Sequence, residues 1–240
     1  MRHIPNFLTS LNLVAGFLSI IYCLNGDLIA ASWLILIAMI FDFLDGFSAR
    51  LLKAYSEIGK ELDSLADIVS FGVAPAVIIY SLISVSLGSS LTPGDSVSRQ
   101  IIPAVMLFIP PVMPVCAALR LAKFNLDPSQ KTSFRGLPTP ANALAVISIV
   151  IAANYSDSSV LNSFLGSPIA ICVSTLVLSI LMVSNIPMLS LKIINFRLKG
   201  NEGRYILAGM VMVSFLITGL SAAPLIVPFY LAASLLSLLF

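Results

Sequence analysis

Long apolar runs, separated by short polar segments, make up most of the chain. Each run approaches or exceeds the roughly 18 to 20 residues that a helix needs to cross about 30 Å of hydrocarbon. The predicted spans cover residues 7–25, 28–48, 62–88, 101–122, 138–155, 168–186, 204–221 and 224–240. The last two are separated by "SAAPLIVP", which is either a turn or a kink. The pattern predicts an all-α, polytopic membrane helix bundle with about eight transmembrane helices.

Composition supports a membrane protein. The 240 residues are 58% hydrophobic and 10% charged, with a mean hydropathy of +1.03, whereas soluble domains carry about 25% charged residues. Without internal repeats, the chain is expected to be a single integral-membrane domain over residues 1–240. The net charge of +2 gives no indication of a nucleic-acid partner. The three cysteines, Cys23, Cys116 and Cys172, are interpreted as packing residues.

The basic residues predict the orientation, because positive charge near the ends of spans stays on the cytoplasmic side. Every Lys and Arg except Arg99 precedes the first span or lies in, or at the edge of, the connection after the second, fourth or sixth span. Both termini are therefore expected in the cytoplasm. The expected location is the prokaryotic plasma (inner) membrane, with a site that faces the cytoplasm.

Four aspartates interrupt the second and third spans near their ends. Asp42 and Asp45 lie about 60° apart on one helix face and about 4.5 Å apart along the axis. Asp63 and Asp67, four residues apart, share a face at the start of the next span. An acid near the bilayer centre costs about 2.5–3.5 kcal/mol on insertion scales, and like charges repel. A compensating partner is therefore expected.

Divalent metal ions fit these acids better than ion pairs do. Of the nearby cations, Lys53 and Lys60 lie on the connecting segment and only Arg50 is close in register. Hard oxygen ligands with too few cations favour Mg²⁺ or Mn²⁺, with two ions expected. An alternative from another class is a cation or proton transporter, because intramembrane acids also mark ion pathways.

The acids belong to a longer pattern over residues 42–67. It reads Asp42-x2-Asp45-Gly46-x2-Ala49-Arg50-x8-Gly59-x3-Asp63-x3-Asp67. With every position filled, it resembles the signature of the CDP-alcohol phosphatidyltransferase family. The resemblance implies a core of six membrane helices, here about residues 1–186, with extra helices at about 204–240. It also implies a homodimer embedded in membrane lipid.

The resemblance further implies a reaction and roles for the residues. The family transfers a phosphatidyl group from CDP-diacylglycerol to an alcohol and releases CMP. Metal ligands would be Asp42, Asp45, Asp63 and Asp67, with Asp67 also the candidate catalytic base. The donor-binding residues would be Asp45, Gly46, Ala49, Arg50 and Gly59. Separately, Asn6, Thr9 and Asn12 are polar positions on or near one face of the first span. They either line the nucleotide site, where Asn6 and Thr9 would join the donor-binding residues, or form ordinary hydrogen bonds between helices.

The acceptor is indicated by other segments. Residues 61–76 "ELDSLADIVSFGVAPA", 120–125 "RLAKFN", 134–143 "FRGLPTPANA" and 4–20 "IPNFLTSLNLVAGFLSI" are similar to the membrane-integral phosphatidylserine synthase branch of the family. L-Serine carries a carboxylate, and Arg120, Lys123 and Arg135 are the available cations. These three residues could instead serve topology or bind lipid headgroups. Glycerol 3-phosphate and an inositol phosphate are the alternative acceptors.

Overall fold

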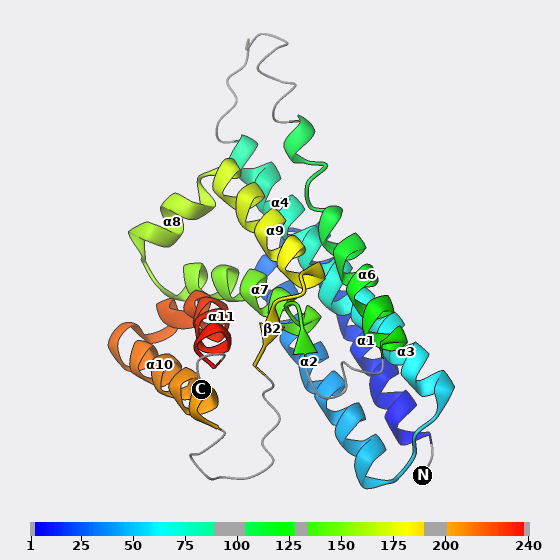
Figure 1. Ribbon diagram of the computed structural model, residues 1–240. Helices are drawn as coiled ribbons and strands as arrows, with labels where there is room; N and C mark the ends of the chain where they lie inside the picture. The colour runs from blue at the N-terminus through cyan, green and yellow to red at the C-terminus, as the bar shows by residue number, and fades with distance from the viewer. Residues whose placement is uncertain (1–2, 89–103, 128–133, 190–200, 238–240) are drawn as a thin grey trace.

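The computed structural model describes residues 3–88, 104–127, 134–189 and 201–237, and most of these are helical (Figure 1). Arg2, Arg99, Lys131 and the basic residues within 190–200, which entered the prediction of orientation, lie outside these ranges. In chain order the elements are α1 (Ile4–Leu24), α2 (Leu28–Leu51), α3 (Glu57–Asp67), η1 (Ile68–Val73), α4 (Ala74–Gly88), α6 (Val112–Leu126), β1 (Phe134–Arg135), α7 (Thr139–Tyr155), α8 (Ser159–Leu165), α9 (Pro168–Val183), β2 (Pro187–Met188), α10 (Glu202–Thr218), η3 (Gly219–Leu225) and α11 (Ile226–Leu236).

Four helical segments of the described chain are long and apolar enough to cross a membrane, and the bent pair α8 and α9 gives a fifth if it counts as one span. The four are Ile4–Leu24, Leu28–Leu51, Glu57–Gly88 and Glu202–Leu236, and α7 is a shorter apolar helix. These segments confirm the predicted all-α class of integral membrane protein. They do not reach the predicted number of eight spans.

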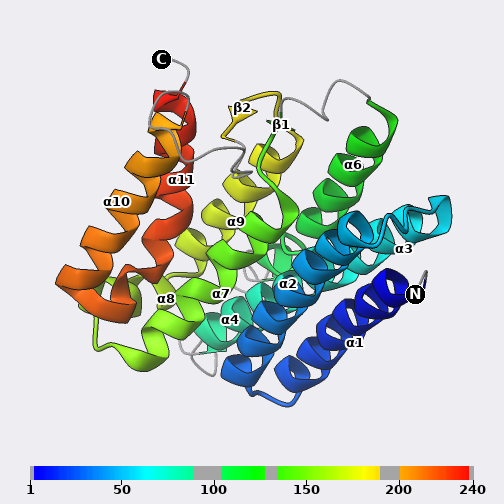
Figure 2. The ribbon, with the colours of Figure 1, turned by 90° about the horizontal axis from the view of Figure 1, so that it is seen from below.

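One predicted span differs from the observed helix for a local reason, and the last two predicted spans are joined by a turn rather than a kink. The span predicted at 101–122 has its continuous helix only from Val112, because Pro110 and Pro111 cannot donate the backbone hydrogen bonds that a helix interior requires. At the other end of the chain, α10 and α11 lie side by side (Figures 1 and 2). The intervening η3 contains Pro224 and begins at Gly219, which has a positive φ of 61°.

The third apolar segment is one helical path with a π turn inside it. Residues 68–73 of η1 join α3 to α4 and follow directly after Asp67. The π turn ends shortly before Pro75, whose missing N–H could not complete an α-helical bond to the carbonyl of Phe71. Since π turns inside helices occur frequently at functional sites, this position beside Asp67 is notable.

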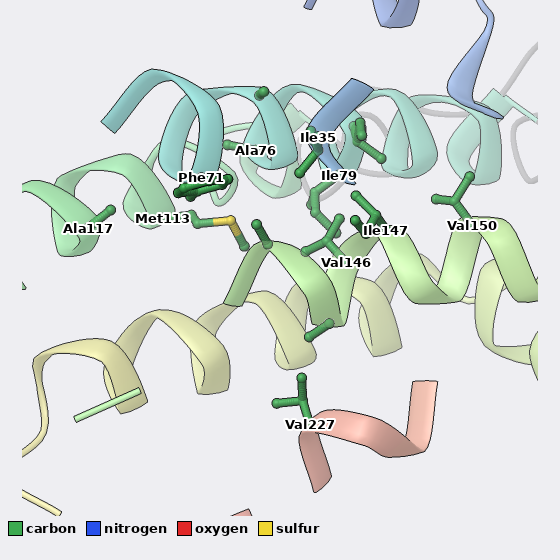
Figure 3. Packing of buried hydrophobic residues seen from close by; sticks show 14 of the residues in the cluster. Ile35, Phe71, Ala76, Ile79, Met113, Ala117, Val146, Ile147, Val150 and Val227 are labelled. Carbon is green, nitrogen blue, oxygen red and sulfur yellow. The ribbon is translucent and has the colours of Figure 1, made fainter. Parts of the chain in front are cut away.

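The core joins helices that are distant in sequence. Ile35 of α2, Phe71 of η1, Met113 of α6 and Val146 of α7 are almost completely buried and pack in one cluster (Figure 3). Helices α1, α2 and α3 form one edge of the bundle, while α10 and α11 form the opposite edge (Figure 2). The core thereby holds the helices that carry the four aspartates.

Candidate active site

Three of the predicted acids meet where α2 and α3 pack near α1. Carboxylate oxygens of Asp42, Asp63 and Asp67 all lie within 4.8 Å of one another. Asp67 is buried, and Asp42 and Asp63 are half-buried. The helical spacing predicted that each pair shares a face, and packing of both helices against α1 brings the pairs together. We call these three residues the carboxylate trio.

The fourth acid, Asp45, lies beside the trio and has a partner on α1. Its Oδ2 accepts a hydrogen bond of 2.5 Å from Thr9 Oγ1. One turn further along α1, Asn12 Nδ2 donates to Asp67 Oδ1 at 3.4 Å. Both α1 side chains are buried. Helix α1 therefore provides a hydrogen-bond donor to one acid of each carboxylate pair.

The donor set of the trio fits a divalent cation. Carboxylate oxygens are the ligands that Mg²⁺ and Mn²⁺ prefer. Asp63 Oδ1 is buried and has no hydrogen-bonding partner among the described residues. Lys60, a possible ion-pair partner, instead donates from Nζ to the carbonyl of Asn125 at 3.2 Å. Asp42, Asp63 and Asp67 are therefore the residues that could hold a metal ion.

A cavity of about 550 Å³ adjoins the acids. Its volume is within the usual range of small-molecule binding sites. All seven residues predicted to bind the lipid donor line it: Asn6, Thr9, Asp45, Gly46, Ala49, Arg50 and Gly59. Asp63 lines it as well, so the cavity reaches the carboxylate trio. A ligand in this cavity would be in reach of a bound metal ion.

Two glycines, Gly46 and Gly59, lie in the cavity wall, and the absence of a side chain has a different consequence at each. A Cβ on Gly46 would meet no atom within 4 Å, so this position leaves space open to the cavity. A Cβ on Gly59 would lie 2.8 Å from Ser56 Oγ and 2.9 Å from Asn6 Oδ1. Gly59 thus allows α3 to approach α1, and Ser56 caps α3 by accepting from the Gly59 N–H.

The three predicted acceptor-binding cations line one small pocket. Arg120 and Lys123 of α6 and Arg135 of β1 enclose about 20 Å³ against the end of α9, where Ser184 and Asn185 complete the wall. Gly136, with a positive φ of 74°, lets this segment pass against the carbonyls of α9, because a Cβ there would lie 2.5 Å from Met182 O. The space is about that of one water molecule.

Arg120, which lines this pocket, is buried and near enough to Asp67 for their charges to interact. Its side chain is 8% exposed and its Nε has no hydrogen-bonding partner among the described residues. The guanidinium lies 6.0 Å from the centre of the Phe124 ring and interacts electrostatically with Asp67. Lys123 and Arg135 are exposed. A buried cation with an unused donor therefore lies near the carboxylate trio.

Some residues of the site were not predicted. Pro5, Ala54, Tyr55, Ser56, Lys60 and Phe124 also line the large cavity. Ser56 had a usable signal, since serine is a preferred residue before a helix start. Phe124 lies in the segment 120–125 that resembles the family, but its place at the cavity comes from the packing of α6, which has no local sequence signature.

The fold and the site define an integral membrane protein with a cluster of carboxylates beside a ligand-sized cavity. Residues 2–212 match the family model described as CDP-alcohol phosphatidyltransferase. The chain therefore belongs to the CDP-alcohol phosphatidyltransferase family, and the match confirms the resemblance seen in the signature.

Curated relatives carry more specific names. The chain is 33% identical over 186 residues to the CDP-diacylglycerol–serine O-phosphatidyltransferase of Bacillus subtilis (strain 168), covering 78% of this chain and 89% of that protein. It is 35% identical over 178 residues to the archaetidylserine synthase of Methanothermobacter thermautotrophicus, covering 73% and 67%. A CDP-diacylglycerol–serine O-phosphatidyltransferase of Mycobacterium leprae is 41% identical over 157 residues, covering 62% and 47%.

Proposed function

We propose that this protein transfers the phosphatidyl group of CDP-diacylglycerol to the hydroxyl of L-serine, giving phosphatidylserine and CMP. The observation that carries the proposal is the carboxylate trio, which adjoins a cavity lined by all seven residues expected to bind the donor. Serine as the acceptor is supported by the names of the similar proteins in Bacillus subtilis and Mycobacterium leprae.

In the proposed reaction the serine oxygen attacks the phosphatidyl phosphorus. A new O–P bond forms, the P–O bond to the CMP phosphate breaks, and CMP leaves with the bonding electron pair. Asp67 accepts the proton of the serine hydroxyl, since an alcohol is a weak nucleophile while protonated. Mg²⁺ or Mn²⁺, as one or two ions held by Asp42, Asp63 and Asp67 with Asp45 beside them, would stabilise charge on the phosphate oxygens.

Donor and acceptor would approach the acids from different sides. Thr9 holds Asp45 at the wall of the large cavity, where Asn6, Gly46, Ala49, Arg50 and Gly59 would surround the nucleotide and pyrophosphate. Arg120, with Lys123 and Arg135, would bind the serine carboxylate near Asp67. The pocket of about 20 Å³ is smaller than serine, so the exposed Lys123 and Arg135 side chains would move on binding.

The membrane arrangement is part of the proposal. In this proposal residues 1–240 form one domain, comprising the family core over about 1–186 and the additional helices α10 and α11. Both termini lie in the cytoplasm of a prokaryotic cell, and the site opens to that side of the plasma membrane. The working form is a homodimer in membrane lipid. Accessibility labelling of single cysteines placed near each terminus would test the orientation.

The reaction is tested by CMP release from CDP-diacylglycerol. Purified protein in lipid–detergent micelles is given Mg²⁺ or Mn²⁺ and either L-serine, glycerol 3-phosphate or an inositol phosphate. We expect release that requires both serine and metal, and that disappears in Asp63→Asn. Asp27→Asn is the matched control, because Asp27 caps the opposite end of α2 and asparagine caps equally well.

Two results would contradict the proposal in different ways. Release with glycerol 3-phosphate or an inositol phosphate, but not with serine, would retain the family chemistry and refute the acceptor. No release with any acceptor would refute the enzymatic reading and favour an ion-transport role for the four acids.

A further inference from the structure

Asn12 of α1 occupies a special position beside the proposed base. It is 0% exposed and its Nδ2 donates to Asp67 Oδ1 at 3.4 Å. Hydrogen bonds of this length in a substrate-free site can tighten when the reacting complex forms. Asn12 is therefore placed to orient Asp67.

The backbone around Asn12 is fixed by unusually close packing. Ser70, in the π turn that follows Asp67, donates from Oγ to the Asn12 carbonyl at 3.0 Å. Ser70 also lies so close to Gly16, one turn further along α1, that a Cβ there would be 2.2 Å from Ser70 Oγ. Helix α1 and the π turn are thus in direct contact, and this contact holds the backbone of α1 at Asn12.

One polar atom of Asn12 makes no hydrogen bond within the described part of the chain. Its Oδ1 is buried and has no hydrogen-bonding partner among the described residues. Leaving a buried acceptor unsatisfied costs about 1–3 kcal/mol. A buried carbonyl oxygen without a partner, next to a reactive carboxylate, points to a ligand that brings a donor.

The unpartnered atoms around Asp67 match the chemistry of an amino acid. Arg120 offers a donor, Nε, and interacts electrostatically with Asp67. Asn12 offers an acceptor, Oδ1, and is hydrogen-bonded to Asp67. L-Serine needs a cation for its carboxylate, an acceptor for its ammonium group and a base for its hydroxyl. Because the hydroxyl and ammonium groups are on adjacent carbons, the base and the acceptor must also be neighbours.

We infer that Asn12 determines specificity for an amino-acid acceptor: its Oδ1 accepts a hydrogen bond from the ammonium group of serine while its Nδ2 holds Asp67. The inference rests on the proposed function and adds to it the group that recognises the amine. It assigns Asn12 a dual role, in binding through Oδ1 and in positioning through Nδ2.

The test separates these two roles with two variants and an analogue. 3-Hydroxypropanoate has the hydroxyl and carboxylate of serine but no amine, and its inhibition constant against serine is measured beside the KM for serine. In Asn12→Leu we expect the serine KM to rise by about 10- to 100-fold, the effect of losing a hydrogen bond to a charged group. The inhibition constant of 3-hydroxypropanoate should change by less than about 3-fold.

Asn12→Asp keeps an oxygen acceptor and the size of the side chain but loses the donor to Asp67. We expect this variant to have a serine KM near that of the unmodified protein and a lower kcat. It also keeps the inference testable if Asn12→Leu does not fold. The KM for CDP-diacylglycerol should be unchanged in both variants.

Several outcomes would overturn the inference. In Asn12→Leu, the inference fails if the serine KM and the inhibition constant of 3-hydroxypropanoate rise by the same factor, or if neither of them changes. In Asn12→Asp, it fails if the serine KM rises as much as expected for the leucine variant. A raised metal requirement would instead make Asn12 Oδ1 part of the metal site. Failure of the unmodified protein to release CMP with serine would refute the proposed function itself, so the two failures are distinguishable.

Discussion

Thr9→Val would remove one hydroxyl from the site while preserving the size of the side chain. Thr9 is 3% exposed, and its Oγ1 lies 2.5 Å from Asp45 Oδ2 and 3.0 Å from the carbonyl of Pro5. A hydroxyl has a single proton, and the charged carboxylate is the stronger acceptor. The substitution therefore removes mainly the hydrogen bond to Asp45.

The expected magnitude follows from the charge and the surroundings of Asp45. A hydrogen bond to a charged group contributes about 1.5–3 kcal/mol, or about 10- to 100-fold in binding or rate. Because Asp45 lines the cavity, water can replace part of the lost interaction in the free protein. We expect kcat/KM for CDP-diacylglycerol to fall at least about 10-fold, with a change in Tm of no more than about 4 °C.

The assay is the initial rate of CMP release at saturating serine and varied CDP-diacylglycerol. Thr9→Ser is the matched control because it keeps the hydroxyl. The double variant Thr9→Val with Asp45→Asn tests whether the effect passes through Asp45. A kcat/KM for Thr9→Val within about 2-fold of the unmodified protein would refute the reasoning. It would also be refuted if the loss of kcat/KM in the double variant equalled the losses of the two single variants combined, because the two substitutions would then act independently.

Four further outcomes are expected. Gly16→Ala should lower Tm in detergent, because its Cβ would lie 2.7 Å from the Ser70 Cα and such overpacking costs about 1–3 kcal/mol; an unchanged Tm would contradict the close contact. Gly46→Ala should leave Tm unchanged and raise the KM for CDP-diacylglycerol, since its methyl group enters open space; a lower Tm would contradict this. Arg135→Ala should raise the KM for serine more than that for CDP-diacylglycerol, and equal effects would count against a serine role. Chelation of divalent cations should abolish CMP release, and Mg²⁺ or Mn²⁺ should restore it; activity that survives chelation would exclude a required metal.

The sequence allowed prediction of the residues that depend on local spacing. Asp63 and Asp67 share a helix face because four residues make about one turn, and the structure joins them to Asp42. Thr9 was expected near the site because it is a polar position on one face of the first apolar span. The two interpretations of Thr9, cavity lining and hydrogen bonding between helices, both apply, because it lines the cavity and donates to Asp45.

Contacts between distant segments could not be predicted in the same way. The approach of Gly16 to Ser70 depends on how α1 crosses the π turn, and neither residue differs locally from those of an ordinary apolar helix. Gly59 lines the cavity, but the reason that no side chain fits there is the close approach of Asn6 on α1. Helix interfaces in membranes also favour small residues. The spacing of the glycines alone therefore could not show whether each one is needed for helix packing or for ligand binding.

Charge balance links the three helices of the site to its proposed chemistry. Helices α2 and α3 supply four carboxylates that repel one another, and the donors from Thr9 and Asn12 leave their total charge unchanged. The buried guanidinium of Arg120 interacts with Asp67, but one positive charge cannot neutralise four acids. The pyrophosphate of CDP-diacylglycerol would add further negative charge. One divalent ion would leave this assembly strongly anionic, whereas two would bring it near balance, so the acids and the donor together favour two ions. In that arrangement the donor completes the metal site, and the acids that are costly to bury alone become stabilising when the substrate binds.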